Sequence, residues 1–388
     1  MNKIDLLYSS EVDQVDYLKD YHRSGWAYVL KYLQSKQNDG AIICDTYVDR
    51  TFHWLKPTCI PYTKPWIGFI HHTFDTKFSN YNNVSLLKNI KFLHSLLHCK
   101  TLFVFGTISM KKWELELKKL KLNVPVISLV HPTEFPTIKF DYNLFKENSE
   151  KKIVQIGAWL RDNYAIFRLN NGKSPLTLGL QKCALIGKDM ENYYKPPSFF
   201  EKIRYDYQEK VPSVSVTLFK GTYSTMSVNA FLPTTTLTGI CRDGVCRNGV
   251  CRDASNNKYV KGAFNLLQEY DKSVQLIKTL SNDDYDDLLS KNVVFLSLVD
   301  GAAINTLNEC IVRNTPIIIN PIPSVVELLG INYPLYYNNL DDILKFDMFD
   351  IKLASEYLET MIDKRVYDIK YFAKSFEQGL EKIKSRTN

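Results

Sequence analysis

The stretch that decides the fold is Val293–Gly330, VVFLSLVDGAAINTLNECIVRNTPIIINPIPSVVELLG. Its pattern predicts a strand, a loop of small residues, a helix, a second strand and the start of another helix. The apolar runs are continuous and do not alternate, which indicates parallel strands that helices cover on both faces. Small residues ahead of a helix let backbone N–H groups approach a phosphate or a sugar. The stretch therefore predicts an α/β domain that binds its ligand beyond the carboxyl ends of its strands.

The same alternation of strands and helices extends over most of the chain. Strands are predicted over 41–44, 66–71, 101–105, 124–130, 152–157, 183–187, 214–219, 293–298 and 315–319. Helices are predicted around 12–37, 84–97, 109–122 and 355–384.

A polar sequence, FDYNLFKENSEKK, interrupts this pattern in the region 137–151 and divides the chain in two. The fold class is therefore α/β, with two Rossmann-like domains and a cleft between them. We predict an N-terminal Rossmann-like domain over 1–145 and a C-terminal Rossmann-like domain over 146–354. The terminal helix, within 355–388, is expected to cross back to the first domain.

Composition indicates an ordinary globular protein. Of 388 residues, 45% are hydrophobic and 23% are charged, so the chain can bury cores without disulfide or metal cross-links. The formal net charge of +7 is too small to indicate nucleic-acid binding, and it is compatible with an anionic ligand or a membrane surface. The start, MNKIDLLYSSEVD, has no apolar signal-peptide core, and no run approaches the ~18 apolar residues of a membrane span. We therefore expect a cytoplasmic protein.

The eight cysteines predict no metal site. Four stand singly in apolar segments, as expected for reduced core thiols: Cys44, Cys99, Cys183 and Cys310. Three belong to the repeat CRDGVCRNGVCRD, at Cys241, Cys246 and Cys251. Their spacing is unlike the close pairs of a structural zinc site, and no histidine lies nearby. Because Gly, Asn and Asp form turns, we expect an exposed insertion loop with reduced thiols.

Glu309 lies one turn inside the helix predicted after the small-residue loop, where a carboxylate is costly to bury unless it accepts hydrogen bonds. Together with the Asn-Thr-Pro at 314–316, it keeps the register in which this stretch resembles the nucleotide-sugar half of GT-B glycosyltransferases, in particular the large retaining group. The resemblance implies that Glu309 binds the ribose of the donor. The family has an earlier acid eight residues upstream; here Asp300 lies nine residues upstream, and Asn305 is expected to contact the sugar instead.

Two earlier stretches match the same family in the same order. KKIVQIGAWLRD resembles the first strand of the donor domain, which implies that Arg161 meets the donor diphosphate. CALIGKDM resembles the next strand, with Lys188 as the second cation. Thr306 and Glu327, the latter in NPIPSVVE, complete the implied donor contacts. Since these cations and helix N-termini can neutralise a leaving diphosphate, we expect metal-independent chemistry and no cofactor.

In the first half, PWIGFIHHTFD places His71 and His72 at the carboxyl end of a predicted strand. A histidine there can bond the transferred sugar or act as a base toward an acceptor hydroxyl. Adjacent strand residues point to opposite faces, so at most one of the pair is expected to be functional, and the other caps the strand or fills the core. Asp75 is the alternative base if the enzyme inverts configuration. His131, in HPTEF, is expected to shape the hinge.

The resemblance implies a glycosyltransferase of glycan biosynthesis that moves a sugar from a nucleotide diphosphate donor to a hydroxyl of a glycan, lipid or protein. A non-catalytic nucleotide- or sugar-binding scaffold and a sugar-nucleotide epimerase stay open as alternatives. The basic sequence SMKKWELELKKLKL, which contains Trp113, predicts a solvated outer helix. Peripheral docking on an anionic membrane is the second interpretation of that helix, and it would suit a lipid-linked acceptor.

Overall fold

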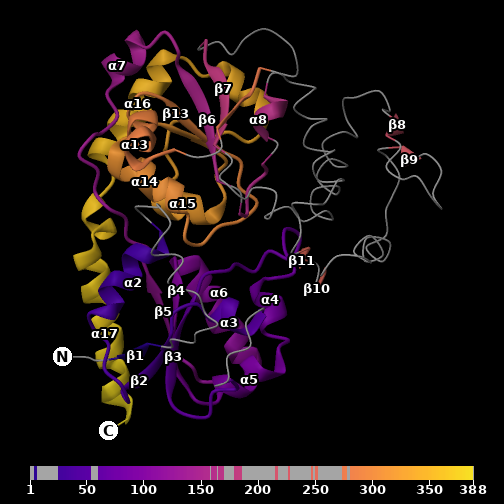
Figure 1. Cartoon of the computed structure of the whole chain (residues 1–388), viewed down its shortest axis with the longest axis vertical. Helices are drawn as coiled ribbons and strands as arrows, with labels where there is room; N and C mark the ends of the chain where they lie inside the picture. The colour runs from indigo at the N-terminus through magenta and orange to yellow at the C-terminus, as the bar shows by residue number, and fades with distance from the viewer. Residues whose placement is uncertain are drawn as a thin grey trace.

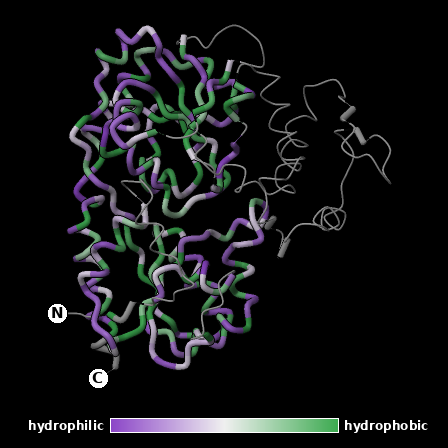
Figure 2. Tube along the Cα trace, viewed as in Figure 1, coloured by the Kyte–Doolittle hydropathy of each residue, from purple (hydrophilic) through white to green (hydrophobic). Residues whose placement is uncertain are grey.

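Two parallel β-sheets form the two halves of the molecule, which follow one another along its long axis (Figure 1). The computed structural model describes residues 4–6, 25–53, 60–157, 159–163, 165–169, 179–185, 215–216, 226–227, 246–247, 250–251, 273–277 and 280–387. Figure 2 shows hydrophobic residues concentrated inside both halves. Two five-stranded sheets, and no sheet that joins the halves among the described residues, confirm the expected α/β architecture.

The strands of the first sheet pair in chain order, and every pair is parallel. They are β1 Ile4–Leu6, β2 Ile42–Asp45, β3 Trp66–Ile70, β4 Cys99–Phe105 and β5 Val126–Leu129. The helices of this half are α2 Trp26–Gln34, α3 Val48–His53, α4 Asn83–Leu86, α5 Ile90–Leu96 and α6 Thr107–Lys119. The side chains of β3 pack in two different hydrophobic cores: Phe69 belongs to one and Trp66 to the other. This burial on both faces is the physical reason for its continuous apolar sequence.

The second sheet has the order β12-β7-β6-β13-β14, again with parallel pairs. Its strands are β6 Lys152–Ile156, β7 Gln181–Leu185, β12 Gln275–Ile277, β13 Val293–Leu296 and β14 Ile317–Ile319. Its helices are α7 Tyr142–Glu147, α8 Ala165–Arg168, α13 Asn282–Ser290, α14 Asn305–Arg313, α15 Pro323–Leu329 and the 3₁₀ helix η2 Leu340–Lys345. Because β6 and β13 are neighbours, the loops that follow them emerge side by side at the carboxyl edge.

The predicted terminal helix is two helices, so the expectation of one helix over 355–384 was wrong. α16 (Met348–Thr360) and α17 (Ile369–Thr387) are separated by the 3₁₀ helix η3 (Lys364–Tyr367). The apolar side of α16 packs in the core of the second sheet, whereas Phe372 and Phe376 of α17 pack in the core of the first. The chain breaks where its apolar residues change partner, and Figure 1 shows α17 beside α2 and the first sheet.

Other sequence predictions have mixed outcomes. The helix expected over 84–97 is divided into α4 and α5, because Asn82 and Asn89 each cap a new helix start. Trp113 of α6 is fully buried in the first half and so is not a membrane-facing anchor. The described part of the helix predicted around 12–37 contains α2. The described part of the strand predicted over 214–219 is β8 (Ser215–Val216), which pairs with β9 (Met226–Ser227).

The cysteine predictions were tested in part. Cys44, Cys99, Cys183 and Cys310 are free and buried. Cys246 and Cys251 lie opposite each other in a short antiparallel pair, β10 (Cys246–Arg247) with β11 (Val250–Cys251), and Cys241 lies outside the described residues. The described residues contain no cluster of metal-ligating side chains. None of the helices in the described part has the length and apolarity needed to cross a bilayer.

Candidate active site between the two sheets

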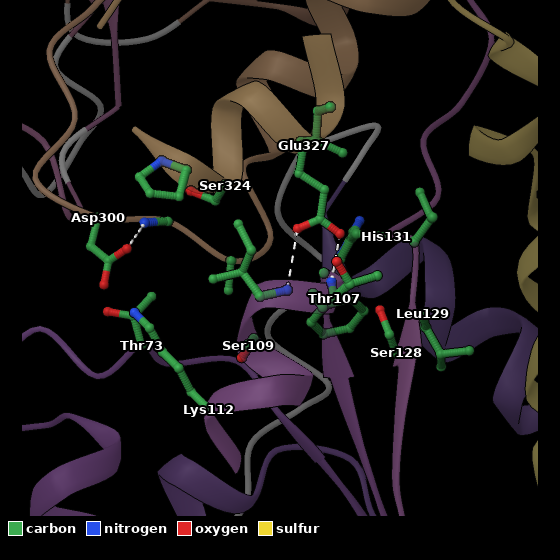
Figure 3. Close-up of a pocket in the computed structure, with 18 of the residues that line it drawn as sticks. Thr73, Thr107, Ser109, Lys112, Ser128, Leu129, His131, Asp300, Ser324 and Glu327 are labelled. Carbon is green, nitrogen blue, oxygen red and sulfur yellow. Dashed lines mark hydrogen bonds between the residues drawn. The ribbon is translucent and has the colours of Figure 1, made fainter. Parts of the chain in front are cut away.

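A pocket lies between the two halves, where the carboxyl ends of their strands meet (Figure 3). In the first half it is lined by the ends of β4 and β5 and by the first turn of α6. In the second half it is lined by the loop after β13 and by residues of α14 and α15. The polar lining residues include Thr73, Thr107, Ser109, Lys112, Ser128, His131, Asp300, Asn308, Ser324 and Glu327. Ligands of parallel α/β domains bind at such a position.

Glu327 joins the halves across this pocket. Its Oε1 accepts the backbone N–H of Thr107 at 2.6 Å, and its Oε2 accepts that of Ile108 at 3.4 Å. These are the first two N–H groups of α6, which has no side-chain cap of its own. Gly106 has φ +86°, and a Cβ there would lie 3.2 Å from Oε2 of Glu327. The carboxylate predicted to contact the donor therefore caps a helix of the other half.

The remaining pocket walls contain unsatisfied hydrogen-bonding atoms. Asn308 is 2% exposed and donates from Nδ2 to the His131 carbonyl at 3.0 Å, while its Oδ1 has no partner among the described residues. The buried hydroxyl of Ser324 likewise has no partner in the part of the chain that the structure describes. In Figure 3, Asp300, Thr73 and Lys112 lie on the side of the pocket away from Glu327 and His131. A ligand with several hydroxyl groups matches this mixture of acceptors and donors.

Arg161 lies where the loop after β6 runs beside the end of β13. The loop is held there by antiparallel backbone bonds from Asp162 N–H to the Ser297 carbonyl and from Val299 N–H to the Leu160 carbonyl. Gly157, with φ +77°, lets the guanidinium approach, since a Cβ there would lie 2.8 Å from Arg161 Nη1. Burial lowers the pKa of Arg161 to about 10, so the group is charged at neutral pH.

The Arg161 guanidinium reaches the start of α14. Its Nη2 donates to Thr306 Oγ1 at 3.1 Å, and its Nε has no partner among the described residues. α14 begins at Asn305 without a side-chain cap, and the buried Oδ1 of Asn305 meets no donor from the described residues. A cation and an uncapped helix N-terminus together favour an anion such as a phosphate. The structure thus brings the predicted residues Arg161, Asn305 and Thr306 together, whereas Lys188 lies outside the described residues.

Glu309 is 2% exposed and lies one turn further along α14. Its Oε2 accepts the hydroxyl of Tyr285 at 2.5 Å, and Oε1 makes no hydrogen bond to a described residue. Arg313, four residues further along α14, donates from Nη2 to the Asp286 carboxylate at 2.7 Å and from Nη1 to the Glu309 carbonyl at 3.4 Å. Burial, followed by the charge of Glu309, raises the pKa of Tyr285 well above its usual range. Tyr285 therefore stays a donor, and one carboxylate oxygen is left for a further donor.

The two adjacent histidines have different environments. Nε2 of His71 lies 3.1 Å from the Thr46 carbonyl, which can only accept, so this nitrogen carries the proton. Rings of Trp26, Tyr47 and Phe105 pack around His71, and burial lowers its pKa to about 3. His72 instead contacts Trp159 of the second half, with ring centroids 5.2 Å apart. Of the pair, His72 is the one that meets the loop carrying Arg161.

Asp75 closes a turn. Its Oδ1 accepts the backbone N–H groups of Lys77 at 3.0 Å and Phe78 at 2.7 Å. These bonds give Asp75 a structural role in the turn that follows β3. Its role as a base toward an acceptor hydroxyl stays a prediction.

His131 is a pocket residue that sequence reasoning assigned to the hinge. Its Nδ1 lies 2.9 Å from the Pro132 carbonyl and so carries the proton, which leaves a lone pair on Nε2. Burial lowers its pKa to about 4, so the ring is neutral at neutral pH. The position of His131 in the sequence could have indicated that it lines the pocket, because it follows β5 as His71 and His72 follow β3.

Comparison with known proteins finds no matching family model and no matching curated sequence. Solved structures do resemble the chain. Sucrose-phosphate synthase from Thermosynechococcus elongatus is 10% identical, with a TM-score of 0.52 over 93% of this chain and 78% of that chain. The Anabaena protein HepE, solved with UDP and glucose, is 8% identical, with a TM-score of 0.48 over 82% of this chain and 72% of that one. At 10% identity, the similarity to sucrose-phosphate synthase establishes the fold alone. The chain has the two-domain GT-B fold, as its sequence predicted.

Proposed function

We propose that the protein is a glycosyltransferase that moves a sugar from a nucleotide diphosphate donor to a hydroxyl acceptor. The observation that supports this most is the grouping at the start of α14. There Arg161 bonds Thr306 beside an uncapped helix N-terminus, and Glu309 keeps one oxygen unbonded a turn away. Such a group offers a cation for a diphosphate and an acceptor for ribose hydroxyls. The GT-B fold, with its pocket between the halves, agrees with this function.

In this proposal Arg161, the N-terminus of α14 and Lys188 stabilise the charge that develops on the leaving diphosphate. The transferred sugar lies in the pocket, where Asp300, Asn308 and Ser324 provide partners for its hydroxyls. The acceptor is a hydroxyl of a glycan, lipid or protein. If the acceptor is lipid-linked, the lysines of α6 would contact the anionic membrane surface. Trp113 of the same helix would not, because its side chain is buried.

The first test is binding and turnover of nucleotide sugars. A panel of donors is screened by thermal shift, because a ligand at 100 times its dissociation constant stabilises a protein by ~2.7 kcal/mol. The donor that binds is then incubated with and without candidate acceptors, in the presence of EDTA. Release of the nucleotide diphosphate with transfer or hydrolysis of the sugar supports the proposal. Binding without turnover indicates a scaffold, and recovery of an isomerised donor indicates an epimerase.

The second test separates the ribose contact of Glu309 from a structural role. Glu309→Gln keeps the size of the side chain and loses the charge, so we expect weaker donor binding and a smaller loss for a 2′,3′-dideoxy donor analogue. Tyr285→Phe is the control, because it removes the protein partner of Glu309 and leaves the carboxylate in place. Equal losses for the natural donor and the analogue in Glu309→Gln would contradict the ribose assignment.

A further inference from the structure

Asp49 is a buried carboxylate beneath the end of β3. It is the second residue of α3 and is 0% exposed. Its Oδ2 accepts the backbone N–H of His71 at 2.6 Å, and its Oδ1 accepts that of His72 at 3.3 Å. Both oxygens therefore hold the backbone where the strand ends and the histidine pair begins.

The same carboxylate also lies beside the ring of His72. Oδ1 of Asp49 is 3.8 Å from Nδ1 of His72. The rings of Tyr47, His53 and Trp159 complete this surrounding, with centroids 6.0, 6.1 and 5.2 Å from His72. Asp49 thus accepts a hydrogen bond from the main chain of His72 and places its negative charge beside Nδ1 of the ring, just after the end of β3.

We propose that Asp49 is a positioning residue for His72: its two oxygens fix the direction in which His72 leaves β3 and favour a proton on Nδ1. This inference rests on the proposed function, in which Nε2 of His72 would contact the transferred sugar or the acceptor hydroxyl. A carboxylate has an acceptor for each of the two N–H groups, whereas an amide has one acceptor oxygen and turns an NH₂ group toward the other N–H. A displacement of His72 by a fraction of an ångström lowers the rate without removing the donor site.

Asp45 provides a matched control in the same half. It is also buried, at 1% exposure, and ends β2 just before α3. Its carboxylate, however, accepts hydrogen bonds from Tyr62, Thr51 and the Tyr47 backbone, and none of these three partners is a histidine. Asp45→Asn therefore removes a comparable buried charge and leaves in place the Asp49 carboxylate that hydrogen-bonds His71 and His72.

The experiment compares sugar transfer by Asp49→Asn, His72→Ala and the double variant, with Asp45→Asn in the same two backgrounds. We expect Asp49→Asn to lower kcat by ~10- to 100-fold with little change in the KM for the donor. The double variant should then be no slower than His72→Ala, because Asp49 acts through His72. Asp45→Asn should have the same relative effect with and without His72. Asp49→Ser, which keeps one acceptor in a smaller side chain, is measured alongside.

A second readout needs no activity. The ¹⁵N chemical shifts of the His72 ring, assigned with the His72→Ala variant, report which ring nitrogen carries the proton. They should change in Asp49→Asn and stay at their wild-type values in Asp45→Asn. Unchanged shifts in Asp49→Asn, or a full additive loss in the double variant, would overturn the proposal. If no nucleotide sugar is turned over, the proposed function fails, and the ring shifts alone decide whether Asp49 positions His72.

Discussion

Asp45 shows how a single buried residue makes the stability of this protein depend on pH. Burial is the main cause that raises its pKa from 3.8 to about 6, although hydrogen bonds from Tyr47, Tyr62 and Thr51 oppose the rise. A raised pKa means that the folded chain binds this proton more tightly than the unfolded chain does. The resulting stabilisation is fully present below pH 3.8 and is lost as the pH rises through about 6.

We therefore predict that Asp45→Asn gains on the wild type as the pH rises from 4 to 8. The variant cannot ionise at this position, so the difference in free energy of unfolding between variant and wild type should shift in its favour by about 2–3 kcal/mol. Urea denaturation at a series of pH values measures this difference. Asp39→Asn, at an exposed position, should show a difference that stays within ~0.5 kcal/mol over the same range. A flat difference for Asp45→Asn would mean that Asp45 is not the titrating group.

At the scale of an element, the start of α6 depends on a residue of the other half. Thr107 and Ile108 donate to Glu327 on α15, and no described side chain of the first half caps this helix. We predict that Glu327→Gln costs about 1 kcal/mol, as the loss of a helix cap does, and that hydrogen exchange at the Thr107 and Ile108 amides becomes faster. Gly106→Ala should cost roughly 1–3 kcal/mol because of its positive φ.

The control for the α6 prediction is a helix capped within its own half. α13 begins at Ser281, whose hydroxyl accepts the Asp284 N–H. Ser281→Ala should weaken α13 by about 1 kcal/mol and leave exchange at Thr107 and Ile108 unchanged. If Glu327→Gln also leaves these two amides unchanged, Glu327 does not hold the halves together in solution.

At the scale of the whole molecule, α17 ties the end of the chain to the first sheet. Phe376 is fully buried there beside Phe69 and Phe103, and the helix approaches so closely that a Cβ on Gly379 would lie 2.8 Å from Phe103. We predict that Phe376→Ala lowers the free energy of unfolding by about 3–5 kcal/mol. Tyr371→Ala, on the same helix and 43% exposed, should change it by less than ~0.5 kcal/mol. Thermal and urea melts of both variants test whether α17 is part of the first core.

The sequence by itself determined the features that depend on near neighbours along the chain. Continuous apolar runs such as those of β3 and β13 predicted parallel strands, since only strands buried on both faces need no polar alternation. The small-residue loop ahead of Thr306 and Glu309 predicted a ligand site at the start of α14, because such a loop lets backbone N–H groups approach a ligand at the carboxyl edge of the sheet. These are consequences of local geometry and burial.

Only the tertiary structure decided which distant groups meet. Glu327 was predicted to contact a donor, yet its carboxylate caps α6, 220 residues away in the chain. His71 and His72 are equivalent in the sequence, and packing encloses one ring among aromatics while it turns the other toward Trp159. The terminal helix breaks because its two parts pack on different cores. The physical reason is the same in each case: a periodic pattern specifies which face is buried, and the partner of that face is set by the packing of the whole chain.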